Sequence, residues 1–124
     1  MDANELRAHC LAKAGVTAEH PFGPDPLVMQ VAGRIFAIID ESASPVTISL
    51  KCDPELAIVL RDSYLAVAPG YHLDKRHWNT ITVNGTIPAT NLADWIDDSY
   101  DLVVDKLPTY VQRDLGWSPG ALEE

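Results

Sequence analysis

Three segments of the chain repeat apolar residues at steps of three and four, the spacing of a helix with one buried face. They cover residues 4–14, 52–64 and 90–107. Gly15 ends the first, while Asp53 and Pro54 open the second as a cap and a residue suited to the first helical position. The predicted buried stripes are Leu6, Cys10 and Leu11; Leu56, Val59 and Leu60; and Leu92, Trp95, Ile96, Ser99, Leu102, Val103 and Leu107.

Short runs with alternating apolar side chains predict strands at 27–31, 34–40, 46–51 and 79–83. The turn at Ala32-Gly33 and the segment 41–45 join the first three runs, which indicates an antiparallel meander. One face of the sheet would then carry the apolar residues Val46, Ile48, Leu50, Ile81 and Val83. The opposite face would carry Thr47, Ser49, Lys51, Trp78, Thr80 and Thr82.

The run 34–40 is apolar on both faces, because simple alternation sets Phe36 and Ile38 against Ile35 and Ile39. We therefore expect a loop or a partner protein to cover part of the second face.

This order of elements predicts an α+β fold, an antiparallel sheet of about five strands with three helices mainly on one face, in the order αβββαββα. The length of 124 residues suits one domain, which we place at 1–115. Residues 116–124 are expected to be a loose tail, from which Trp117 could dock on the body of the domain.

Composition adds an uneven distribution of charge. The chain is 47% apolar and 22% charged, as in globular proteins, and its net charge is −9. Residues 91–124 carry two basic and eight acidic side chains, whereas residues 51–90 carry four of each. Such a chain repels polyanions at long range, and only a local basic patch could reverse that repulsion.

The N-terminus lacks the pattern of an export signal, and no apolar run is long enough to span a bilayer. A cytoplasmic location, no membrane partner and reduced Cys10 and Cys52 are therefore expected.

Catalytic and metal-binding patterns are weak. His72 and His77 are five residues apart, which matches neither the helical nor the strand spacing of paired metal ligands. The start of a helix after Cys52 could lower the pKa of its thiol, and His72 or His77 could form an acid–base pair with Asp74. The sequence contains no phosphate-binding loop, dinucleotide-binding glycine pattern or nucleophile elbow. We expect no enzymatic activity, no cofactor and no metal.

The stretch GYHLDKRHWNT, residues 70–80, concentrates cations and aromatic rings in the least acidic part of the chain. Lys75, Arg76 and His77 could contact phosphates, and Trp78 could stack on a base. In a purely structural alternative, Trp78 packs on the sheet while Lys75 and Arg76 pair with carboxylates of the last helix. In a third alternative, the exposed sheet face with Trp78, Thr80 and Phe36 binds a protein or a small ligand.

Four motifs, HPFG (20–23), SLKCDPELA (49–57), GYHLDKRHWNT (70–80) and SYDLVVDKLP (99–108), resemble the MmcQ/YjbR-like family of small bacterial proteins in order and spacing. The resemblance implies a CyaY-like or secretion-chaperone-like α+β domain. It also implies DNA binding, after the winged arrangement proposed for the family, and no catalytic residues. An oligomer is possible, since a second subunit could add contacts. The candidate contact residues are Lys51, Tyr71, His72, Lys75, Arg76, His77, Trp78 and Thr80.

Overall fold

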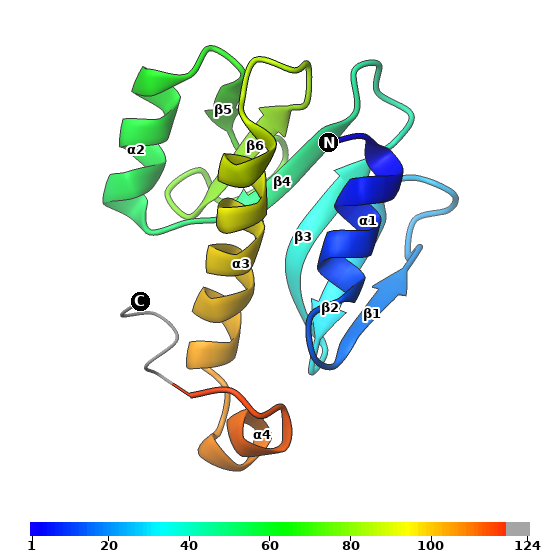
Figure 1. The fold of residues 1–124 in the computed structure, drawn as a ribbon, viewed down its shortest axis with the longest axis vertical. Coiled ribbons are helices and arrows are strands. Elements are labelled where there is room, and N and C mark those ends of the chain that lie inside the picture. The colour runs from blue at the N-terminus through cyan, green and yellow to red at the C-terminus, as the bar shows by residue number, and fades with distance from the viewer. Residues whose placement is uncertain (119–124) are drawn as a thin grey trace.

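Six strands form one antiparallel sheet in the computed structural model, which describes residues 1–118 (Figure 1). Their order across the sheet is β1-β2-β3-β4-β6-β5, so β1 and β5 are the two edges. The strands are β1 (Val16–Glu19), β2 (Leu27–Val31), β3 (Arg34–Asp40), β4 (Thr47–Lys51), β5 (Val67–Pro69) and β6 (Trp78–Thr82).

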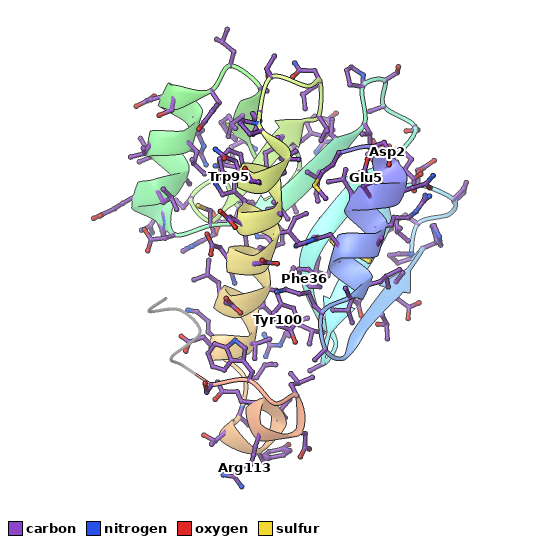
Figure 2. The ribbon with its side chains drawn as sticks, in the orientation of Figure 1. Asp2, Glu5, Phe36, Trp95, Tyr100 and Arg113 are labelled. Carbon is purple, nitrogen blue, oxygen red and sulfur yellow. The ribbon has the colours of Figure 1, made fainter. Side chains whose placement is uncertain are left out.

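The helices are α1 (Ala3–Leu11), α2 (Pro54–Ser63), α3 (Ala89–Asp105) and α4 (Thr109–Asp114). The first three lie over the same face of the sheet, while α4 extends beyond the end of α3 (Figure 1). A capping box starts α1, in which the backbone N–H of Glu5 donates to the Asp2 carboxylate at 2.8 Å and the Glu5 carboxylate accepts from Asp2 N–H at 3.2 Å (Figure 2). As predicted, Asp53 caps α2 and Pro54 occupies its first turn.

The α+β class and the helix-covered antiparallel sheet are confirmed, with one more strand and one more helix than expected. The additional strand, β1, has little apolar alternation of its own and forms by pairing with β2 from Val16↔Val31 to Glu19↔Val28. The additional helix, α4, begins after Pro108, where the predicted last helix has already ended. Trp117 lies within the predicted tail and its indole N–H donates to Asp101 at 2.9 Å. Residues 119–124 of that tail lie outside the described residues.

A β-bulge changes the predicted faces of β3. Met29 pairs with Ala37 but Gln30 pairs with Ile35, so Phe36 is an extra residue in β3. Phe36 is fully buried beneath α3, where its ring meets Tyr100 edge-to-face at 5.4 Å (Figure 2). The prediction that Phe36 lies on the exposed sheet face with Trp78 and Thr80 is therefore wrong.

The predicted stripes of two helices also need correction. Leu11 is 47% exposed at the end of α1, and Val59 is 54% exposed on α2. The residue that α2 buries is Ala57, whose small side chain lets the helix approach the sheet at Asn79. In α3 the predicted stripe is largely correct, because Leu92, Ile96, Ser99 and Val103 are buried, and Tyr100 and Val104 join them.

The main core lies between the sheet and its helices, and it includes Leu6, Met29, Phe36, Ile48, Ile81 and Ile96. Outside this core, Val28 of β2, which pairs with Ile38, is only 1% exposed, so it too is shielded from solvent. Among residues 1–118, no helix combines the length and the apolar character that a bilayer crossing requires.

Candidate nucleic-acid interface

The segment between β5 and β6, residues 70–77, is a structured turn built on Asp74. The Asp74 carboxylate accepts the backbone N–H of Arg76 at 3.0 Å. The Asp74 carbonyl accepts the N–H groups of His77 and Trp78 at 3.2 and 3.0 Å. His72 adopts a left-handed conformation with φ of 58°, which reverses the chain before this turn. The cations of this segment are therefore presented from an ordered backbone.

Arg61 of α2 holds the same segment from the helix side. Its Nε–H donates to the Asn79 side-chain oxygen at 2.6 Å, and its Nη2 donates to the carbonyls of Lys75 and, at 3.3 Å, Trp78. Asn79 is 2% exposed and donates in turn to the Ala57 carbonyl at 3.3 Å. One guanidinium thus joins α2, β6 and the turn, a role that its planar group of donors suits.

Trp78 faces away from the helices. It pairs with Lys51 in the β4–β6 register, three positions along from the core pair Ile48↔Ile81, and an odd number of positions places a side chain on the opposite face of the sheet. Its side chain is partly buried, and it does not belong to the apolar side chains that pack against the helix-side core. On the same face, Thr80 shares a hydrogen bond with Ser49 at 2.8 Å and accepts Tyr71 N–H at 3.0 Å.

Lys75 and Arg76 are exposed, and neither forms an ion pair within residues 1–118. The Lys75 ammonium donates to the Gly70 carbonyl at 3.2 Å. Asp97 of α3, the helix predicted as the last one, pairs instead with Lys13 at 2.9 Å and with His9 at 2.8 Å. The alternative in which carboxylates of the last helix neutralise Lys75 and Arg76 is therefore wrong.

A second group of cations lies at the same end of the sheet. Arg34, Lys51 and Lys106 line a cavity of about 160 Å³ together with apolar side chains. Arg34 starts β3, Lys51 ends β4 and Lys106 follows α3, so these three positions come together at the end of the sheet where β6 begins with Trp78 (Figure 1). We call Arg34, Lys51, Lys75, Arg76 and Lys106 the basic end.

The predicted contact residues fall into two groups. Lys51, Lys75, Arg76 and Trp78 lie at or beside the basic end, whereas Thr80 is held by Ser49 and Tyr71 and has little free hydrogen-bonding capacity. Tyr71 is 74% exposed, and its ring lies 4.0 Å from the ring of His72, centroid to centroid. Arg34, Arg61 and Lys106 were missed, because no local motif marks them and only the strand register and helix packing place them here.

The groups considered for catalysis do not assemble into a reactive centre. His77 and Asp74 are 3.9 Å apart at the solvent, which is beyond hydrogen-bond distance. The pKa of the Cys52 thiol is raised to about 11 by burial and then by Asp53 and Asp98, so the expected lowering at the helix start is wrong. Burial also raises the pKa of Cys10, to about 12. Within residues 1–118, no three His, Cys, Asp or Glu side chains are grouped to hold a metal ion.

The sheet-face alternative loses one of its three residues, because Phe36 is buried under α3. Trp78 and Thr80 remain on that face, but neither of them lines the apolar cleft that opens between α2, α3 and the sheet.

Comparison with known proteins gives one consistent family. The YjbR family profile matches residues 11–102. The protein YjbR of Escherichia coli K12 is 33% identical over 108 residues, which cover 87% of this chain and 92% of that protein. The protein YbdF of Escherichia coli O157:H7 is 38% identical over 93 residues, 75% of this chain and 76% of YbdF. None of these names states an activity.

Solved structures support the same fold. A crystal structure of a Deinococcus radiodurans protein with a DUF419 domain superposes with a TM-score of 0.89 at 35% identity, covering 94% of this chain and 89% of that one. A crystal structure of a Pseudomonas syringae protein gives a TM-score of 0.73 at 27% identity, covering 82% of this chain and 98% of that one.

Proposed function

This chain belongs to the YjbR family, and we propose that it is a non-enzymatic DNA-binding protein that contacts the phosphate backbone through the basic end. The observation that carries the proposal is the separation of charge in three dimensions. The chain has nine Lys and Arg residues and a net charge of −9. Two of these cations, Arg7 and Lys13, are neutralised by Glu41 and Asp97 on the other side of α3, while those of the basic end make no ion pair within residues 1–118.

The acidic side chains have a different location. Asp94, Asp97, Asp98 and Asp101 line a groove between α3 and the end of α1, together with Trp117, and Asp98 also borders a second cavity that it shares with Lys51. Their repulsion of DNA is weakened by salt, whose screening length is about 8–10 Å at physiological ionic strength. Asp74 and Glu55 lie closer to Lys75 and Arg76, and they limit the strength of the contact.

The geometry favours contact with phosphates over reading of bases. Lys75 and Arg76 are exposed on the turn and Lys51 lies across from Trp78, so a strand of phosphates could meet three cations in succession. Of the described helices that border this region, α2 carries Glu55 and Asp62 beside Arg61, and α3 ends on Asp105 with no basic side chain in its last turn, which suits both poorly to a DNA groove. The proposal is therefore sequence-independent binding of modest affinity.

Fluorescence anisotropy with a labelled DNA duplex tests this proposal at about 50 and 200 mM salt. Three phosphate contacts, from Lys51, Lys75 and Arg76, give a slope of about −2.7 in a plot of log affinity against log salt. The affinity then falls roughly 40-fold over this range of salt. The Lys75→Ala/Arg76→Ala variant would retain one contact, with a slope near −0.9 and a loss of about threefold to fourfold.

Arg113→Ala is the matched control, because Arg113 is an exposed cation on α4, outside the basic end (Figure 2). It should bind DNA like the wild type. Absence of binding at the lower salt, or equal slopes for the wild type and the double variant, would refute the proposal.

A further inference from the structure

An apolar cleft separates α2 from α3 and has a volume of about 160 Å³. Its floor is formed by Leu50 of β4 and Ile81 of β6. Its walls are Leu56 and Leu60 from α2, and Trp95 and Leu102 from α3. The cleft is distinct from the basic end, although Lys51 borders both.

The walls of the cleft are apolar side chains that the protein leaves partly open to solvent. Leu56 is 40% exposed, and Leu60, Trp95 and Leu102 are only half-buried. Helices that closed on each other would bury these side chains, as close-packed protein interiors do. A cavity of about 150 Å³ lined by apolar side chains accepts a molecule of the size of benzene, so the volume fits one ring.

Two contacts keep the cleft in shape. The ring of Trp95, which is labelled on α3 in Figure 2, packs edge-to-face on Tyr64 with ring centroids 5.4 Å apart, and this contact fixes one wall. The Asn79 amide, also at the floor, is engaged by Arg61 at 2.6 Å and by the Ala57 carbonyl at 3.3 Å. The side-chain oxygen and nitrogen of Asn79 therefore each have a partner already, so the floor offers a ligand mainly apolar contact.

The charge at the rim selects the kind of molecule. Asp53, Asp98 and Lys51 lie there, giving two carboxylates against one ammonium. The Asp53 carboxylate caps α2 by accepting Glu55 N–H at 3.1 Å, whereas Asp98 has no hydrogen-bond or ion-pair partner within residues 1–118. Burial and the carboxylates of Asp101, Asp94 and Asp97 raise the pKa of Asp98, and the ammonium of Lys13 offsets this rise only in part.

We propose that this cleft binds a small organic cation, with a ring-sized apolar group between α2 and α3 and a protonated amine at the Asp98 carboxylate. The proposal goes beyond DNA binding and does not depend on it. The apolar group would cover Leu56, Leu60 and Leu102, and the amine would form the ion pair that Asp98 does not make within residues 1–118.

The test uses two probes that share a ring and differ in charge, phenethylamine and phenylacetate. Methyl and indole NMR spectra of the full chain are recorded as each probe is added to about 10 mM, a range that detects affinities in the millimolar class. Phenethylamine should shift the methyl signals of Leu60 and Leu102 and the indole signal of Trp95. Phenylacetate should shift them at least about threefold less at the same concentration, because the rim carries a net negative charge.

Two variants and a control locate the site. Asp98→Asn should weaken phenethylamine binding about twofold to fivefold, the range of a partly exposed ion pair, without affecting the fold. Leu102→Trp should fill the cleft and abolish the shifts, and Val59→Ala, on the outer surface of α2, should leave them unchanged.

A chemical readout supports the same assignment. Cys52 borders the cleft, and Cys10, the other cysteine, is fully buried. Phenethylamine should slow alkylation of Cys52 by iodoacetamide in proportion to the occupancy measured by NMR. The proposal is overturned if neither probe shifts the cleft signals, if phenylacetate binds as well as phenethylamine, or if Asp98→Asn binds phenethylamine as tightly as the wild type.

Discussion

Replacing Arg61 by lysine keeps the positive charge and removes the geometry that holds residues 70–78 to α2. The guanidinium donates in two directions, to the Asn79 side chain and to the carbonyls of Lys75 and Trp78. A lysine ammonium is a single point of donors on a flexible stem and cannot reach all three acceptors. The substitution therefore separates the role of the hydrogen bonds from the role of charge.

The cost can be worked out from the acceptors that lose their donor. Asn79 is 2% exposed, and a buried acceptor without a partner costs about 1–3 kcal/mol. The Trp78 carbonyl keeps its bond from Gly70 N–H at 2.9 Å, and the Lys75 carbonyl is near solvent, so both add little. We expect Arg61→Lys to lower the free energy of unfolding by about 2 kcal/mol. With an unfolding entropy of about 2.1 cal/mol/K per residue over 124 residues, the melting temperature should fall by about 8 °C.

Thermal unfolding followed by circular dichroism measures this shift, and hydrogen exchange at Gly70 and Trp78 shows whether the turn loosens locally. Arg113→Lys is the control, an exposed arginine on α4 whose replacement should change stability by less than about 0.5 kcal/mol. If Arg61→Lys melts within about 2 °C of the wild type and the exchange rates are unchanged, Arg61 does not hold the turn as the structure implies.

Three further predictions follow from single contacts. Ser99→Ala removes the buried hydroxyl that donates to the Phe36 carbonyl at 2.6 Å and accepts Lys51 N–H at 2.9 Å. Urea unfolding should show that the free energy of unfolding falls by about 1–3 kcal/mol, and an unchanged midpoint contradicts this. Gly70→Ala places a Cβ 2.7 Å from Trp78 Cβ, so it should cost about 1–3 kcal/mol and shift the Trp78 indole signal, and normal stability would disprove the crowding. Asp98→Asn should raise the melting temperature at neutral pH. The folded-state pKa of Asp98 lies above its ordinary value of 3.8, so ionisation destabilises the fold as pH rises through that range, and the advantage of the variant should vanish below about pH 4; an advantage that persists there contradicts the assignment.

Local patterns predicted most of the helices and strands. The Asp53-Pro54 start of α2, the long stripe of α3 and the strands β2, β3 and β4 all depend on residues adjacent in sequence, so they could be found without knowledge of contacts. β1 and α4 were missed because their stability comes from remote partners. β1 exists through its register with β2, and the Gln112 side chain of α4 donates to the carbonyls of Val104 and Asp105 at the end of α3.

The candidate site shows the same division. The sequence identified residues 70–80, because cations and rings are concentrated there, and the alternation of β6 correctly turned Trp78 away from the helices. It could not identify Arg61. This residue lies on α2, 14 positions before Lys75, and holds the segment by donating to the Lys75 carbonyl. A single bulge also reversed the exposure of Phe36, since one extra residue moves a strand side chain to the other face.

The sequence by itself determined the class of fold, the family and the segment that carries the concentrated cations, since each of these depends on residue types at short, fixed spacing. Only the tertiary structure decided which charges are neutralised and which cluster. Lys13 meets Asp97 across a distance of 84 positions, while Arg34, Lys51 and Lys106 converge on one cavity from β3, β4 and the end of α3. Electrostatic attraction depends on separation in space, and separation in space is set by strand register and helix packing, which local composition does not specify.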